Sequence, residues 1–195
     1  MAKTDDLRYQ RTESAIRSVF MELAATEQIP AITVSALCRR AGISRNAFYL
    51  HHTSVHALYG ALINELVDDV RAESIASAQR VAATGDIDEQ LAPAIMEALC
   101  RHETLLRALL PSDNGPLAQC LTLGLEEAYI DAGLLLGKNA GSFLHEMTCA
   151  FAAWAHVGFV VRWIAETERP LTEATPLFEE LQAGLASTAA RLLIE

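Results

Sequence analysis

The sequence predicts an all-α protein with about nine helices, arranged as a small N-terminal three-helix domain and a larger C-terminal helical bundle. Apolar residues recur at the spacing of a helix face along most of the chain, whereas the alternation typical of strands is rare. Glycine, proline and capping residues interrupt these stripes at intervals that suit helices. Apolar residues make up 51% of the 195 positions, enough to fill one large core or two small ones.

Three helices are expected in the N-terminal domain. An amphipathic stripe predicts the first from about Leu7 to Thr26, and Pro30 prevents it from continuing. Thr33 suits the N-cap of a second helix, and Gly42 suits the chain reversal that ends it. Ser44 suits the N-cap of a third.

The next two helices begin the C-terminal bundle. Ser54 suits the start of a fourth helix that continues to about Ala82, which is about 40 Å at 1.5 Å per residue. Asp86 and Glu89 resemble a capping box for a fifth helix, whose apolar stripe extends over residues 91–110. We therefore expect two long helices here, joined by a short turn.

The rest of the chain predicts a loop and three more helices. Residues 111–116 have the composition of a loop, residues 117–132 that of a helix, and glycines follow up to residue 141. The helix over residues 142–167 is apolar nearly all round, so we expect it to be buried on more than one side. Thr175 and Pro176 begin a last helix, whose small residues after position 182 allow close approach of another helix, such as one from a second subunit.

The charges divide the chain near residue 60. The net charge is −10, but residues 1–60 hold seven Lys and Arg against five Asp and Glu, whereas residues 61–195 hold eight against twenty. This division fits a chain that contacts nucleic acid at one end only, although acidic soluble proteins also show such asymmetry by chance. We expect two domains, residues 1–60 and 61–195.

The cysteines and the apolar segments indicate a cytoplasmic protein. Cys38, Cys100, Cys120 and Cys149 are far apart, form no CxxC pair and lie among apolar residues, as reduced core thiols do. The N-terminus lacks a signal-peptide pattern, and the most apolar stretch, residues 147–161, is shorter than a membrane span. The six histidines show no ligand spacing such as HExxH, so we expect no metal and no cofactor.

Residues 33–52 have the pattern of a helix-turn-helix, in which two short helices meet at a glycine turn and the second enters the DNA major groove. Arg45 and Asn46 lie in the first turn of that second helix. Arginine pairs bidentately with guanine and asparagine with adenine, while Ala47 is small enough to allow close approach and offers a methyl group to thymine. The alternative to a base-reading role is that Arg45 and Asn46 are ordinary exposed polar residues at the start of a helix.

About fifty residues, from position 8 to 63, resemble the TetR-type bacterial transcriptional regulators. The resemblance is carried by Arg11-Thr12, Ile16, Phe20, Leu23, Ile32-Thr33-Val34, Leu37, Ala41-Gly42-Ile43-Ser44-Arg45, Phe48-Tyr49, His51 and Leu58. A second stretch, residues 151–170, resembles a C-terminal type of this family whose members include dihydroxyacetone-kinase operon regulators, but it assigns no ligand. The family implies a homodimer with DNA-binding heads and a helical C-terminal domain for effector binding and dimerisation.

The resemblance also implies roles for further residues. The family positions that match Tyr49 and His51 bind phosphates; a core-edge ring and a solvated side chain are the respective alternatives. Thr33 and Ser54 begin helices, where free N–H groups bind phosphate, and plain capping is the alternative. The expected DNA-binding residues are Thr33, Ser44, Arg45, Asn46, Ala47, Tyr49, His51 and Ser54.

Three positions depart from the family pattern. His52 replaces the usual aromatic residue, Val55 replaces a lysine that meets a phosphate, and Gln28 replaces a glycine. His56 substitutes for that lysine only in part near neutral pH. The departures leave open a different class of protein, an adaptor or coactivator with a degenerate head that acts through a protein partner.

The expected function is a transcriptional regulator, a repressor in the commoner case, that binds a palindromic operator as a homodimer through its last two helices. We expect a small apolar or amphipathic effector in the C-terminal domain. Its candidate contacts are Met96, Leu99, Cys100, Cys120, Tyr129, Met147, Phe151, Trp154 and Arg162, with Leu106, His102, His145 and His156 beside them; core packing is the alternative for each. An enzyme is not expected, since the sequence has no P-loop, GxGxxG, GxSxG or paired-carboxylate motif.

Overall fold

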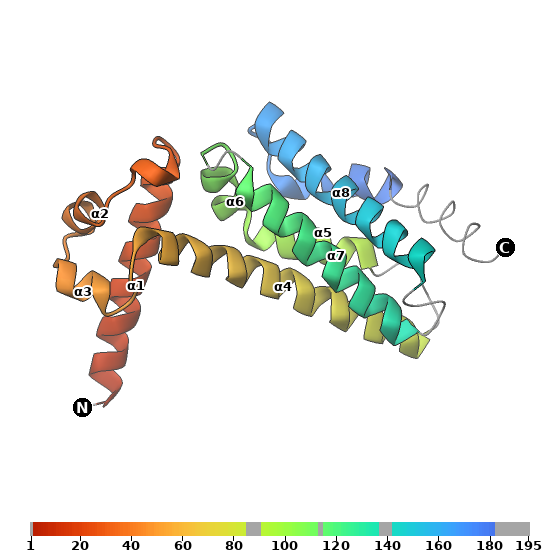
Figure 1. Ribbon diagram of the computed structural model, residues 1–195, viewed down its shortest axis with the longest axis horizontal. Coiled ribbons are helices and arrows are strands. Elements are labelled where there is room, and N and C mark those ends of the chain that lie inside the picture. Colours follow the sequence, from red (N-terminus) through yellow and green to blue (C-terminus); the bar gives the residue numbers. More distant parts are fainter. Residues whose placement is uncertain (1, 85–90, 113–114, 137–141, 182–195) are drawn as a thin grey trace. The chain divides into compact units, whose positions relative to one another are not determined.

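The protein is all-α in the parts that the structure describes, which are residues 2–84, 91–112, 115–136 and 142–181 of a computed structural model. No strand occurs in these ranges, so the predicted fold class is confirmed. Figure 1 shows the order of the elements. They are α1 (Ala2–Ala24), the 3-10 helix η1 (Ile29–Ala31), α2 (Val34–Ala41), α3 (Arg45–Tyr49), α4 (Val55–Thr84), α5 (Leu91–Arg101), α6 (Glu103–Leu109), α7 (Pro116–Leu136), α8 (Phe143–Glu166), the 3-10 helix η2 (Leu171–Glu173) and a helical segment over residues 175–181.

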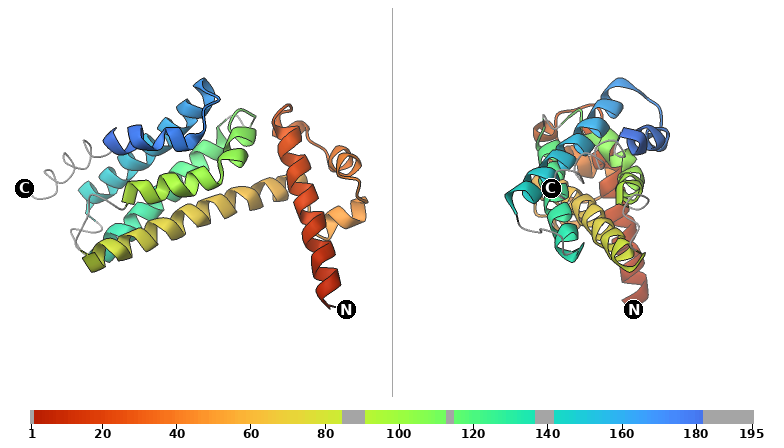
Figure 2. Two further views of the ribbon diagram at one scale, coloured as in Figure 1. Left: turned by 180° about the vertical axis from the view of Figure 1, so that it is seen from behind. Right: turned by 90° about the vertical axis from the view of Figure 1, so that its right-hand side faces the viewer.

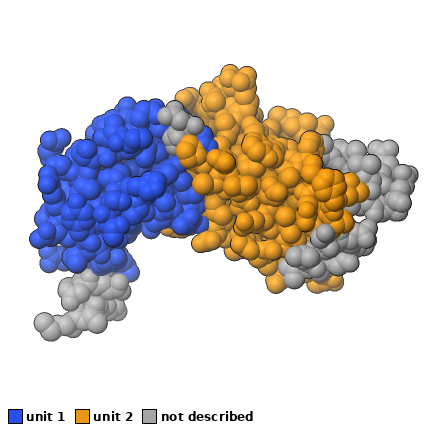
Figure 3. Space-filling model, viewed as in Figure 1, with its two compact units in different colours: residues 1–64, 105–115 blue, residues 65–104, 116–195 orange. Residues whose placement is uncertain are grey.

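The chain separates into two compact units, which Figure 3 colours separately. The first unit comprises residues 1–64 and 105–115, and the second comprises residues 65–104 and 116–195. The helix α4 therefore contributes its first ten residues to the first unit and the rest to the second. Residues 105–115 join the N-terminal unit from a distant part of the sequence, whereas the sequence pattern had assigned them to the C-terminal domain.

The first unit is held together by large apolar side chains from four helices. Ile16 and Phe20 of α1, Leu37 of α2, Phe48 of α3 and Leu58 of α4 are each 0% exposed. Burial of a side chain of this size contributes about 1.5–3 kcal/mol. This core fixes which faces of α2 and α3 point inward, and hence which side chains they present to solvent.

The second unit is a bundle that contains the later part of α4 with α5, α7 and α8 (Figure 2). α7 and α8 pack side by side, and a side chain at Gly133 of α7 would collide with the ring of His145 of α8. A side chain at Gly124 would likewise come within 2.5 Å of Val67. The two glycines therefore allow α7 to approach its neighbours more closely than a larger residue would.

The expected single fifth helix is wrong, because the chain forms two helices that meet at His102. Arg101 and His102 both bind the carboxylate of Asp69, with His102 Nε2 3.0 Å and Arg101 Nη2 3.0 Å from Asp69 Oδ2. The backbone N–H of His102 donates to the carbonyl of Leu99, three residues back, at 3.1 Å. This is the hydrogen bond of a 3-10 turn, which is tighter than an α-helical turn.

The expectation that α8 is buried on more than one side is also wrong within one chain. Its inward residues, such as Ala153 and Val157, are buried, but Phe143, Met147, Phe151 and Trp154 are 77%, 52%, 60% and 64% exposed. We call these four residues the α8 stripe. By length and composition alone α8 is also the one helix in the described ranges that would cross a membrane, a test that an apolar bundle helix passes equally well.

Most local expectations match the structure within a few residues. α1 begins at Ala2, earlier than expected, and Ser142 caps α8 by accepting a hydrogen bond from the backbone N–H of His145. All four cysteines are free; Cys38 and Cys149 are buried, but Cys120 is exposed, so the expectation of four core thiols is wrong for that residue. The expected cap at residues 86–89, the glycine link over residues 137–141 and the last helix beyond residue 181 lie outside the described residues.

Candidate nucleic-acid interface

The helix-turn-helix is built by local hydrogen bonds that the sequence predicted. The Thr33 hydroxyl accepts from the backbone N–H of Ala36 at 3.1 Å, which makes it the N-cap of α2. Gly42 then takes the left-handed conformation, with φ of 67°, and Ser44 caps α3 by accepting from the N–H of Ala47 at 3.1 Å. The Ser54 hydroxyl accepts from the N–H of Ala57 at 3.0 Å where α4 begins. Each of these hydroxyls therefore caps a helix. A phosphate contact at Thr33 or Ser54 stays a prediction.

α3 presents polar side chains to solvent and anchors itself by one apolar residue. Phe48 is fully buried, whereas Arg45 and Asn46 are exposed and Tyr49 is 54% exposed. Ala47 is partly exposed between them. The residue after α3, Leu50, is 78% exposed, which the sequence analysis did not predict. Its position, two residues after the buried Phe48, was a signal, because residues two apart do not share a helix face.

His51 does not point to solvent, and its side chain would have to leave the first unit's interior to meet a phosphate as predicted. Its side chain is only 3% exposed, its Nδ1 lies 2.9 Å from Glu13 Oε2, and its ring stacks on Tyr9 at 3.8 Å. His52 Nε2 binds the same carboxylate at 3.0 Å, and Arg17 Nε donates to it at 2.7 Å. A carboxylate on α1, 38 residues away in sequence, thus holds the segment that follows α3.

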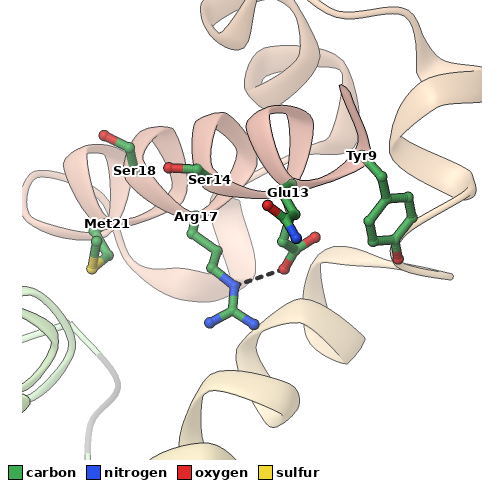
Figure 4. Close-up of a pocket in the computed structure, with 7 residues that line it drawn as sticks. Tyr9, Glu13, Ser14, Arg17, Ser18 and Met21 are labelled. Carbon is green, nitrogen blue, oxygen red and sulfur yellow. Dashed lines mark hydrogen bonds and ion pairs between the residues drawn. The ribbon is translucent and has the colours of Figure 1, made fainter. Parts of the chain in front are cut away.

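Figure 4 shows Glu13 and Arg17 joined on α1, beside Tyr9. Partial burial raises the pKa of the Glu13 carboxyl, but the hydrogen bond from Arg17 and the charge of His52 outweigh burial and leave that pKa below its ordinary value. The seven residues that line the hollow in this view all belong to α1, and none of them is a predicted ligand contact.

Two cations of the first unit are engaged by carboxylates, and one expected cation is absent. Arg17 pairs with Glu13, and Arg40 pairs with Glu22 at 3.2 Å. Val55, which replaces the lysine of the family pattern, is 9% exposed and packs in the apolar core. α3 carries a positive charge of its own on Arg45, whose Nη2 donates to Ser35 Oγ at 2.9 Å.

The nine predicted ligand contacts are divided between buried and exposed positions. Met96 and Leu99 are fully buried core residues, and the buried Tyr129 hydroxyl binds His156. Cys100 is half-buried, and Cys120 is exposed. The other four, Met147, Phe151, Trp154 and Arg162, lie exposed along α8, where Arg162 pairs with Glu166 at 3.2 Å. Burial of Met96, Leu99 and Tyr129 agrees with the core alternative, and the four residues on α8 face outward. A contact of any of the nine with an effector stays a prediction.

Comparison with solved structures supports the fold. The chain is similar to the structure titled dihydroxyacetone kinase operon activator DhaS, with a TM-score of 0.57 and 16% identity over 93% of this chain and 96% of that one. It also aligns with the TetR family repressor AlkX from Dietzia sp. strain DQ12-45-1b, with a TM-score of 0.38 and 19% identity over 89% of this chain and 97% of that one. No family model matches the sequence, and no curated protein does. The chain therefore has the fold of a solved operon activator along nearly its whole length.

Proposed function

We propose that this protein is a TetR-type transcriptional regulator that binds a palindromic DNA operator as a homodimer and acts as a repressor. The observation that carries the proposal is the arrangement of α3, where buried Phe48 anchors one face and Arg45, Asn46 and Tyr49 are exposed on the other. Arginine and asparagine at the start of a recognition helix are the residues that read guanine and adenine. Tyr49 suits a phosphate contact, which orients the helix without reading sequence.

The α8 stripe supports the homodimer. Phe143, Met147, Phe151 and Trp154 are spaced as one face of the helix, and Leu177 and Leu181 of the next helical segment are also 46% and 53% exposed. A row of large apolar side chains that faces water marks an interaction site. A second copy of the chain covers such a stripe in a two-fold dimer, because the same face then meets itself. The two heads would then stand about one turn of DNA apart, roughly 34–36 Å.

A membrane is a poorer occupant of the α8 stripe. Residues 61–195 hold twenty acidic residues against eight basic ones, and anionic lipid surfaces repel such a unit.

Gel filtration with light scattering, at several protein concentrations, tests the dimer. The wild type is expected at twice the chain mass, and Trp154→Glu is expected to shift it toward one chain mass, whereas Leu123→Glu, at an exposed residue of α7, serves as the matched control. Flotation of the wild type with neutral lipid vesicles, or a dimer that Trp154→Glu leaves intact, would refute this part of the proposal.

Control by a small apolar or amphipathic effector belongs to the proposal as well. α4 is one continuous helix that begins in the unit of the DNA-reading residues and continues into the second unit. A ligand that binds the second unit more tightly in one arrangement of the dimer would favour that arrangement and its spacing of the heads. The difference in affinity sets how far the equilibrium between the arrangements moves.

Selection of bound duplexes from a randomised pool, followed by titration at several salt concentrations, tests DNA binding. The wild type is expected to enrich a palindrome and to bind it more weakly as salt rises. Arg45→Ala should lose about 1–3 kcal/mol of discrimination at one base pair of each half-site, while Tyr49→Phe should weaken all duplexes alike. Identical behaviour of the two variants would refute the roles given to α3.

An adaptor that acts through a protein partner is the second candidate, and one observation favours it. Two phosphate contacts expected of the family are missing, because Glu13 holds His51 and Val55 is buried. The similar solved structure is also named an activator and not a repressor. In the same selection, an adaptor would enrich no sequence at any salt concentration. If the wild type does enrich a palindrome, a reporter gene placed behind that palindrome separates repression from activation.

A further inference from the structure

Arg45 is fixed on the surface of α2 by a hydrogen bond to Ser35. Arg45 is the first residue of α3, and its Nη2 donates to Ser35 Oγ, in the first turn of α2, at 2.9 Å. Both side chains are exposed, so neither is confined by the core. Burial raises the pKa of the Cys38 thiol on α2, and the positive charge of Arg45 opposes that rise, which agrees with a guanidinium that lies close to α2. The hydroxyl of Ser35 therefore selects one of the many rotamers open to an exposed arginine.

The bond to Ser35 leaves the guanidinium able to read a base. A guanidinium carries five N–H donors, and Ser35 accepts from one of them. A bidentate contact with guanine O6 and N7 uses two. The remaining four donors are enough for that contact while the hydrogen bond to Ser35 persists.

We propose that Ser35 is a positioning residue for base reading by Arg45, and this proposal rests on the DNA-binding function proposed above. An arginine that is already oriented loses less side-chain entropy when it meets the base. The hydroxyl also disfavours the rotamers that would reach other bases or phosphates. Ser35 thus contributes to specificity without touching a base.

The position of Ser35 suggests a competing role, which the test must separate. The start of α2 is a place where hydroxyl and backbone N–H groups bind DNA phosphates. A phosphate contact contributes equally to all sequences and adds to the salt dependence of binding. A positioning residue contributes only where Arg45 reads a base, so its effect disappears when Arg45 is removed.

A double-mutant cycle measures this coupling on the full chain. Affinities are determined for the selected palindrome and for the same duplex changed at the base pair that Arg45→Ala identifies. Ser35→Ala is expected to reduce the ratio of the two affinities by about three- to tenfold, the range that corresponds to one freed arginine side chain. In the Arg45→Ala background, Ser35→Ala should leave the ratio unchanged. Ser35→Thr retains the hydroxyl and should preserve the ratio, and Ser14→Ala, at an exposed serine of α1, is the matched control.

Two results would overturn the proposal. An unchanged ratio in Ser35→Ala, whether both affinities stay the same or both fall equally, would show that Ser35 does not position Arg45. A drop in the ratio that persists without Arg45 would assign Ser35 a base contact of its own. If the wild type selects no sequence, the proposed DNA-binding function fails and this inference fails with it, whereas the first two results leave that function standing.

Discussion

Acidification from pH 7.5 to 5.0 should destabilise the second unit through one buried histidine. His156 of α8 is 2% exposed, and the ring of Phe178 lies 4.2 Å from its own. Its Nδ1 lies 2.8 Å from the carbonyl oxygen of Ala152, and the Tyr129 hydroxyl lies 3.0 Å from its Nδ1 and 3.2 Å from its Nε2. These contacts suit a neutral imidazole that donates from Nδ1 and accepts at Nε2. Burial lowers the pKa of His156 from 6.5 to about 4, although the bond to Ala152 opposes that change.

The size of the effect follows from that pKa. Between pH 6.5 and 4 the unfolded chain binds a proton at His156 that the folded chain excludes, so the free energy of unfolding falls as the pH falls. The contribution is complete above pH 6.5 and is lost progressively toward pH 4. For pKa values of 6.5 and about 4, linkage gives a loss of about 2 kcal/mol between pH 7.5 and 5.0. At pH 5.0 the carboxylates of Glu13 and Asp69, whose pKa values lie below the ordinary range, are still charged.

Urea unfolding at pH 7.5 and 5.0, at one protein concentration, measures this loss. The wild type should lose about 2 kcal/mol more than His156→Gln over this interval. His56→Gln removes an exposed histidine from α4 and should follow the wild type. Where His156→Gln does not fold, NMR titration of the His156 ring in the wild type gives the same information. Equal losses in the wild type and His156→Gln, or a ring that titrates above pH 6, would refute the reasoning.

Two further predictions concern the first unit. Gly42→Ala should lower the free energy of unfolding by about 1 kcal/mol, because φ at this position is 67° and no atom lies within 4 Å of the added methyl group, which leaves backbone strain as the cause. Gly42→Asn should be tolerated better, and urea unfolding that shows the Ala variant as stable as the wild type would contradict the strain argument. Glu13→Gln should lower the free energy of unfolding by roughly 1 kcal/mol at pH 7. Because folding lowers the pKa of Glu13, this difference between variant and wild type should vanish as the pH falls below 4.5. A difference that persists in acid would show that the shape of the side chain, not its charge, stabilises the protein there.

The start and end of most helices could be predicted because the signals are local. Thr33, Ser44 and Ser142 each accept a hydrogen bond from a backbone N–H three residues on, and Gly42 has the positive φ that ends a helix. Each of these features depends on residues within one helical turn. A single sequence contains all the information needed for such an interaction.

The contacts that sequence analysis missed join residues far apart in the chain. Asp69 and His102 meet across 33 positions, at the point where one expected helix is two, while Glu13 and His51 meet across 38, and Glu13 holds a side chain that was predicted to meet DNA. No periodic pattern signals which histidine will meet which carboxylate. The α8 stripe was missed for a similar reason. A hydrophobic helix face has the same sequence spacing whether a core, a ligand or a second chain covers it.

The withdrawn phosphate contacts have a consequence for how the proposed regulator would recognise DNA. Non-specific affinity comes mainly from cations on phosphates, and here Glu13 engages Arg17 and His51 while Val55 supplies no charge. If the protein binds DNA as proposed, we expect this head to bind arbitrary DNA more weakly than a head that keeps both phosphate contacts, and to depend more on the base contacts of α3. Two heads joined through the α8 stripe would then be needed to reach useful affinity, since the second head binds at high effective concentration. The dimer contact and the orientation of Arg45 therefore become the two features on which operator recognition depends most.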